Sequence, residues 1–272
     1  MKKEFVDEIL AGFSRFIQDG SYRAFKKKEG GQTSKSELGG VYQTIYGNTD
    51  HYVLFKQGRN DGETISEFIA SKFYNYALHG FSASVFLATK NENTNTKIVN
   101  KQNFHSEVYI GSIFFKEFRE IFKLMDLRDR PKFLRTFHES KSRNFVARYK
   151  QTNLGEVLAV SLWLGDYDTH IANLGAANIN GNMHFVKIDH GWSFAELQYQ
   201  MDYKKVPWSK VNGFGKPTNH FTDYDYEDLY TNPNLPFAQK LLALKHIDRN
   251  DIRKILVLAF NELQMYYSFS AF

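Results

Sequence analysis

The chain has 272 residues, of which 42% are hydrophobic, and a formal net charge of +5. This is enough apolar material for one large domain or two smaller lobes with a real core. The absence of cysteine excludes disulfides, thiolate nucleophiles and cysteine-zinc sites. No apolar run reaches the roughly 18 to 20 residues of a membrane span, and the Met-Lys-Lys start leads into an amphipathic stretch rather than a signal sequence. We therefore expect a soluble, cytoplasmic protein.

The first elements are a helix and a loop. Apolar residues recur at helical spacing over residues 3–18, which predicts a helix that ends at Gly20. A basic cluster at 23–28 and a Gly/Ser-rich passage follow, which we interpret as a flexible loop or the approach to a first strand.

Residues 39–46 and 51–56 predict two strands joined in a hairpin. Gly39 and Gly40 stand ahead of the first of these strands. Glycines there let the backbone approach a phosphate closely, although a pair of glycines is also typical of an ordinary turn. Lys56 ends the second strand, where a lysine either binds an anion or is simply solvated.

An amphipathic helix is predicted at residues 64–78. Thr64-x-x-Glu67 forms a capping box at its start, so the Glu67 carboxylate could serve the helix N-terminus. Short strands then follow at 84–88 and 107–111, and the later helical patterns lie at residues 112–125, 154–164, 236–246 and 250–266. Residues 192–236, which precede the last two predicted helices, are rich in proline and aromatic residues. This composition predicts mainly loop.

Positive charge is concentrated in one stretch. Residues 116–150 contain 11 Lys and Arg against 5 Asp and Glu, a net +6. Such an asymmetry favours an anionic partner, whether a nucleotide, a phosphoinositide headgroup or an acidic protein. A solvated basic helix face is the alternative interpretation.

Polar side chains cluster on both sides of Asn180-Gly181. Asn-Gly between two apolar runs is a strong hairpin signal, because both central residues take positive φ. Folding at this turn should bring Asp189 beside Asp168 and Asn173. Oxygen ligands of this kind suit a magnesium ion and the phosphates that accompany it. The alternative interpretation is a polar hairpin with Asx turns that has no catalytic role.

The sequence Asp168-Thr-His170-Ile-Ala-Asn173 resembles the D-x-H-x-x-N catalytic loop of HipA-like kinases, and it is similar to the D-R-x-x-x-N loop of phosphatidylinositol kinases. The resemblance implies that Asp168 orients or deprotonates the acceptor hydroxyl and that Asn173 holds magnesium. His170 is a further candidate catalytic residue, and it departs from the basic residue that the lipid kinases carry.

The segment Ile188-Asp189-His190-Gly191 resembles the I-D-N-G-L-A-F segment of type II phosphatidylinositol 4-kinases. The resemblance implies that Asp189 binds magnesium against the nucleotide phosphates. His190 stands where these kinases usually have Asn.

The candidate nucleotide-binding residues are Gly39, Gly40, Lys56 and Glu67. Val-Leu-Phe-Lys56 is similar to the V-F-K of phosphatidylinositol kinases, whose lysine contacts the nucleotide phosphates. In a kinase, a glutamate on the following helix pairs with this lysine. Glu67 is the first candidate for that pairing and Glu63 the second, and the capping box remains the competing role for Glu67.

The resemblance runs in order from Gly39 to Phe194. It implies an α+β, two-lobed protein-kinase-like fold, with a small β-rich N-lobe at residues 1–110 and a larger helical C-lobe at 111–272. It also implies magnesium-dependent phosphoryl transfer from ATP, with a phosphoinositide as the first candidate acceptor and a Ser/Thr protein, as in HipA-like kinases, as the second. Peripheral contact with an anionic membrane fits the basic stretch, and no nucleic-acid partner is expected.

Other functions stay open. A metal-dependent hydrolase could use the carboxylates and imidazoles around the hairpin as ligands, namely Asp166, Asp168, His170, Asp189 and His190. A pseudokinase that acts as an interaction module and a nucleotidyl transferase are further alternatives. A secreted bacterial effector that acts in a host cytosol or at a membrane surface would have the same composition.

Overall fold

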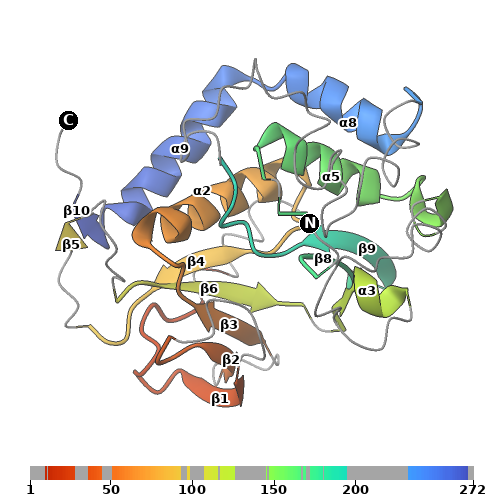
Figure 1. Cartoon of the computed structure of the whole chain (residues 1–272). Coiled ribbons are helices and arrows are strands. Elements are labelled where there is room, and N and C mark those ends of the chain that lie inside the picture. Colours follow the sequence, from red (N-terminus) through yellow and green to blue (C-terminus); the bar gives the residue numbers. More distant parts are fainter. Residues whose placement is uncertain are drawn as a thin grey trace. The chain divides into compact units, whose positions relative to one another are not determined.

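The computed structural model describes residues 10, 12–27, 36–44, 51–92, 97–98, 107–115, 117–125, 145, 147–166, 168–169, 172–179, 181–194 and 232–268. These residues form a mixed α+β structure (Figure 1). The chain divides into two compact units: unit 1 comprises Met1–Phe115 with Asp248–Phe272, and unit 2 comprises Lys116–Ile247. Within the described ranges, we found no helix with the length and hydropathy that crossing a bilayer requires.

The strands of unit 1 are β1 (Tyr22–Lys27), β2 (Gly40–Thr44), β3 (Tyr52–Lys56), β4 (Val85–Ala88), β5 (Lys97–Ile98), β6 (Tyr109–Phe114) and β10 (Tyr267–Ser268), and its helices are α2 (Asp61–Ala77) and α9 (Arg249–Leu263). Unit 2 contains the strands β7 (Arg119–Glu120), β8 (Leu174–Ile179) and β9 (Asn182–Lys187) and the helices α3 (Ile121–Leu124), α5 (Leu154–Trp163) and α8 (Pro236–Lys245).

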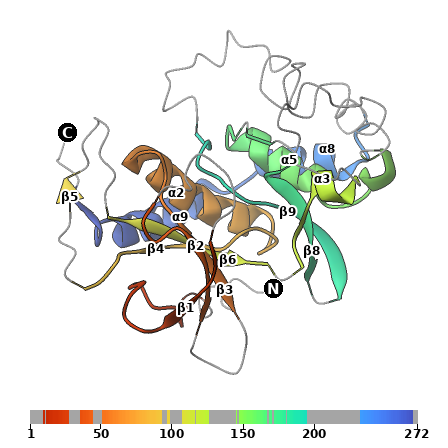
Figure 2. The same ribbon diagram turned by 60° about the horizontal axis from the view of Figure 1, so that its bottom comes forward.

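A five-stranded antiparallel sheet, in the order β1-β2-β3-β6-β4, forms the framework of unit 1 (Figure 2). β2 and β3 are the two strands predicted at 39–46 and 51–56. Their register pairs Gly40 with Phe55, so the start of β2 lies beside the end of β3, where Lys56 stands. Gly40 and Lys56 therefore lie at the same end of two neighbouring strands in the interior of the sheet.

The N-terminal part of unit 1 differs from the prediction. Residues 12–18 form turns rather than the predicted helix, and residues 1–9 lie outside the described part. The backbones of Arg15 and Ile17 bond to Thr89 beside β4, and the Ser14 hydroxyl bonds to Asp19. Such side-chain bonds compete with a helix. β1 was interpreted as a basic cluster; its exposed charges are typical of an edge strand.

α2 packs on the sheet and against α9 (Figure 1). A buried apolar cluster joins them, with members Phe68, Val85, Leu87, Val108, Ile110, Ala259, Leu263 and Tyr267. The Tyr76 hydroxyl donates to Asp251 Oδ2 at 2.6 Å. The residues from 248 onward therefore belong to unit 1. The sequence had predicted that they belong to the second lobe, at residues 111–272.

β6 continues where a helix was predicted. Its residues Ser112, Ile113 and Phe114 pair with β3, so the predicted helix at 112–125 is reduced to the short α3. Gly111 explains how β6 fits: it lies between Phe55 on β3 and Phe86 on β4. Long-range pairing therefore overrides the local helical periodicity here.

In unit 2 the predicted hairpin forms. β8 and β9 are antiparallel, Ile179 pairs with Asn182, and Gly181 takes a φ of +82°. The predicted helix at 154–164 is α5. Its N-cap residue Asn153 exchanges two hydrogen bonds of 2.8 Å with the backbone of Phe185 on β9, so the start of α5 is attached to the hairpin.

Adding a methyl group at Gly111 should destabilise unit 1. A Cβ there would lie 2.5 Å from Phe86 Cζ and 2.9 Å from Phe55 Cε1, and both rings are fully buried. We expect Gly111→Ala to lower the free energy of unfolding by about 1–3 kcal/mol, measured by urea denaturation. Ser112→Ala, at the next position of the same strand, is the control and should cost less than about 1 kcal/mol. An unchanged midpoint for Gly111→Ala would contradict this account of the sheet.

Candidate active site

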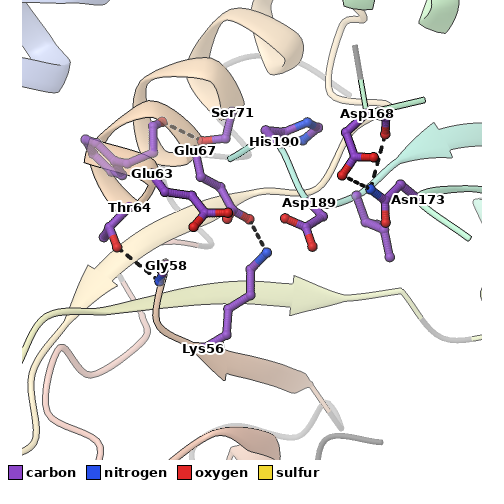
Figure 3. Close-up of polar contacts among 12 residues, drawn as sticks. Lys56, Gly58, Glu63, Thr64, Glu67, Ser71, Asp168, Asn173, Asp189 and His190 are labelled. Carbon is purple, nitrogen blue, oxygen red and sulfur yellow. Dashed lines mark hydrogen bonds and ion pairs between the residues drawn. The ribbon is translucent and has the colours of Figure 1, made fainter. Parts of the chain in front are cut away.

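A buried ion pair joins β3 to α2 in unit 1. Lys56 Nζ lies 2.7 Å from Glu67 Oε1, and both side chains are almost completely buried (Figure 3). A charge removed from water must be paired to be tolerated. Glu67 therefore holds the Lys56 ammonium at the end of β3.

The helix cap leaves Glu67 available for this pairing. α2 begins earlier than predicted, because Asn60 is its N-cap and accepts a 2.8 Å bond from the Glu63 N–H. Thr64 instead accepts a 3.1 Å bond from the Gly58 N–H. The capping box predicted from Thr64 to Glu67 therefore does not form. Glu63, the second candidate partner for Lys56, is bound by Arg59 at 3.0 Å.

Gly39 and Gly40 enter β2 from a turn. The Gly39 N–H donates to Ser36 O at 3.0 Å, and a Cβ on Gly39 would collide with the Ser36 hydroxyl. The close approach within this turn is thus enough to account for a small residue at position 39. Contact of these glycines with phosphate stays a prediction.

In unit 2, Asp168 and Asn173 are bound to each other. Asn173 Nδ2 donates to Asp168 Oδ2 at 2.9 Å and to Asp168 O at 3.1 Å (Figure 3). These bonds fix the orientation of the buried Asn173 amide. They occupy its nitrogen and leave Oδ1 as the amide atom with acceptor capacity. Asp168 is half-buried. His170 lies outside the described residues.

Asp189 follows β9, as the hairpin predicts. The Ile188 N–H donates to Asn173 O at 2.9 Å, so the segment carrying Asp189 runs beside Asn173. Asp189 is half-buried and takes a φ of +63°. Its carboxylate and the Asn173 amide oxygen are hard oxygen donors, which fit a magnesium ion.

A second buried ion pair, not foreseen from the sequence, lies under this loop. Lys187 Nζ is 2.9 Å from Asp166 Oδ2, and neither side chain is exposed. The Ser193 hydroxyl donates to the same oxygen at 3.0 Å, and His190 Nδ1 lies 3.7 Å from it. Burial alone would raise the pKa of Asp166, but the charge of Lys187, together with the nearby His190 imidazole, lowers it to about 2.

From the sequence, Asp166 is a candidate ligand in the hydrolase alternative and is otherwise expected to cap or brace the loop, while Lys187 has no expected role. The sequence does contain an indication of this ion pair. Lys187 follows Phe185 and Val186 at the end of an apolar strand, and a lysine buried in such a strand needs a carboxylate partner. The sequence offers several aspartates nearby, and only the fold identifies Asp166 as that partner.

A model of the LepB N-terminal domain family matches residues 110–268. The chain belongs to this family. The matched range begins in β6 and contains the Asp168 loop and the β8–β9 hairpin, while Lys56 and Glu67 precede it.

Two further comparisons were made. Among solved structures, the Helicobacter pylori proinflammatory kinase CtkA is similar over 90% of this chain and 91% of its own, with 17% identical residues and a TM-score of 0.45. A comparison with curated proteins found no match.

Removing the charge of Asp166 should be far more costly than removing that of its neighbour Asp168. Asp166→Asn leaves the Lys187 ammonium buried without a carboxylate, so we expect a loss of about 3–5 kcal/mol in the free energy of unfolding. Asp168→Asn keeps an oxygen acceptor for Asn173 and should cost less than about 1 kcal/mol. Urea denaturation at pH 7 measures both, and equal losses would contradict the assigned pairing.

Acid should reduce the loss of stability that Asp166→Asn causes. The pKa of Asp166 lies below its ordinary value of 3.8, so its contribution is complete above that pH and is lost as pH falls towards about 2. The stability difference between the parent protein and Asp166→Asn should therefore shrink over this window in a pH series of denaturation curves.

Proposed function

We propose that this protein is a magnesium-dependent phosphotransferase that uses ATP, with a phosphoinositide as its acceptor. The observation that carries the proposal is the buried pairing of Lys56 on a strand with Glu67 on the following helix. In protein kinases, a strand lysine paired in this way positions the nucleotide phosphates. The proposal includes a two-lobed, protein-kinase-like arrangement of the two units.

Each candidate residue has a defined task in this reaction. Lys56 binds the nucleotide phosphates while Glu67 keeps its ammonium in place. Asn173, through Oδ1, and Asp189, through its carboxylate, hold Mg²⁺. The bound ion supplies charge neutralisation for the phosphates.

Asp168 acts on the acceptor. The acceptor hydroxyl oxygen attacks the γ-phosphorus, its proton passes to the Asp168 carboxylate, and the bond between the γ-phosphorus and the bridging oxygen breaks to release ADP. The hydrogen bond from Asn173 Nδ2 to Asp168 Oδ2 supports this role, because it holds the carboxylate in one orientation, and the bond to Asp168 O restrains the backbone of the same residue.

The choice of a lipid acceptor rests on the segment Ile188–Gly191 and its resemblance to type II phosphatidylinositol 4-kinases. The basic stretch 116–150 and the aromatic passage 192–208, which fit a membrane-facing role, lie mostly outside the described residues. A HipA-like Ser/Thr protein kinase is the second candidate, supported by the Asp168-x-His170-x-x-Asn173 pattern.

The hydrolase alternative is less consistent with the site. It needs Asp166 and His190 as metal ligands, yet both are fully buried and Asp166 is paired with the Lys187 ammonium. A cation next to a ligand carboxylate opposes the binding of a second cation. In the described part of the chain, no group of three or more His, Asp or Glu side chains is arranged to hold a metal ion.

Two substitutions should separate metal binding from catalysis. Asp189→Ala should abolish or strongly weaken magnesium-dependent ATP binding in calorimetry, because the ion loses its carboxylate ligand. Asp168→Asn, which keeps an oxygen acceptor for Asn173, should bind Mg-ATP as tightly as the parent protein and lose turnover by at least about 100-fold. Parent-like Mg-ATP binding by Asp189→Ala would remove Asp189 from the metal site.

The acceptor can be identified in one assay. Purified protein is incubated with radiolabelled ATP and Mg²⁺, in parallel with phosphoinositide liposomes and with a protein extract. We expect label in the lipid fraction. Label only in protein bands would replace the lipid acceptor by a protein acceptor. Label in neither, with Mg-ATP still bound, would indicate a missing activator or a pseudokinase.

A further inference from the structure

One buried ammonium connects two parts of the candidate site. Lys187 Nζ lies 2.9 Å from Asp166 Oδ2, donates to Asp189 O at 2.8 Å and reaches Ile188 O at 3.3 Å. A lysine ammonium has three N–H donors. Each of these donors therefore has an acceptor within the protein. One acceptor is the Asp166 carboxylate, and the other two are the backbone carbonyls of Ile188 and Asp189, the candidate metal ligand.

The Asp189 backbone requires such support. A φ of +63° is unfavourable for a residue with a Cβ, and it persists only where surrounding contacts over-determine it. The bond from Lys187 to Asp189 O restrains the peptide plane that follows this residue. The direction of the Asp189 carboxylate depends on that same backbone conformation.

Asp166 anchors the other end of the connection. Its N–H donates to Ser161 O at 2.8 Å near the end of α5, and it stands two residues before Asp168. The Ser193 hydroxyl donates to its carboxylate at 3.0 Å, and the Phe194 N–H donates to Leu164 O at 2.8 Å. These two hydrogen bonds connect the turn after Asp189 to the residues that precede the candidate catalytic loop.

We propose that Asp166 and Lys187 form a positioning pair that fixes the turn at Asp189 and thereby the metal-binding carboxylate. This inference rests on the proposed function. Neither residue touches the nucleotide or the acceptor; each acts through the backbone of Asp189 and of the Asp168 loop. Groups behind a metal ligand typically change metal affinity or activity by about 10- to 100-fold when they are removed.

A purely structural pair would behave differently from a positioning pair. Replacing both members of a buried ion pair by well-packed hydrophobic side chains of similar volume is often neutral for stability, because no unpaired charge stays behind. The double variant Asp166→Asn with Lys187→Met removes both charges, keeps side-chain sizes similar and leaves an oxygen acceptor for Ser193. It also removes the donor to Ile188 O and Asp189 O, which is the feature that the inference concerns.

The experiment compares this double variant with the parent protein in three measurements. These are the thermal midpoint, the magnesium concentration that gives half-maximal ATP binding in calorimetry, and amide hydrogen exchange of the peptide spanning residues 187–194. The matched control is Glu156→Gln with Lys240→Met, which removes a partly exposed pair of 3.5 Å between α5 and α8.

We expect the double variant to melt near the parent, to need about 10- to 100-fold more magnesium, and to exchange faster in the 187–194 peptide. The control should match the parent in all three measurements. Parent-like magnesium dependence of the double variant would overturn the inference, whatever its exchange rate, because the pair would then be structural only.

Two other results are also decisive. If the parent protein binds no Mg-ATP, the proposed function fails, and exchange alone then decides whether the pair fixes the Asp189 turn: faster exchange supports it and unchanged exchange overturns it. If the double variant does not fold, Ser193→Ala takes its place, since it keeps both charges and removes one bond to Asp166. A magnesium requirement raised severalfold would support the pair, and an unchanged one would overturn it.

Discussion

A lysine ammonium without access to water must be given a negative partner and enough acceptors, and this requirement organises unit 2. Lys187 meets it through Asp166 and two backbone carbonyls. The partners come from the loop after α5 and from the segment after β9, so meeting the requirement holds these segments together. Lys56 and Glu67 answer the same requirement in unit 1, where the pair joins a strand to a helix.

Local signals made part of this structure predictable. Asn-Gly between apolar runs predicted the β8–β9 hairpin, and apolar periodicity predicted α2, α5, α8 and α9 to within a few residues. The hairpin in turn placed Asp189 beside Asn173, because two antiparallel strands of equal length return the chain to its starting point. The pairing of Lys56 with Glu67 was expected only from the resemblance to kinases, in which a glutamate on the following helix pairs with the strand lysine.

The remaining features depend on contacts between residues far apart in sequence. Ser112 to Phe114 have a helical pattern, yet their pairing with β3 makes them strand. The sequence of β1 has too little alternation of apolar and polar residues to be recognised as a strand. It forms a strand because its backbone pairs with β2. The partner of Lys187 is 21 positions away (187 minus 166), and several aspartates compete for that role in the sequence.

The division of the chain also constrains how the protein is made. Unit 2 is one continuous stretch, whereas unit 1 combines the start of the chain with residues from 248 onward. On the ribosome, the apolar side of α2 around Phe68 must wait for Ala259 and Leu263, which complete its cluster, until all of unit 2 has been synthesised. Unit 2 has all its residues earlier, so the nascent protein passes through a stage in which the first unit still exposes apolar surface that chaperones recognise.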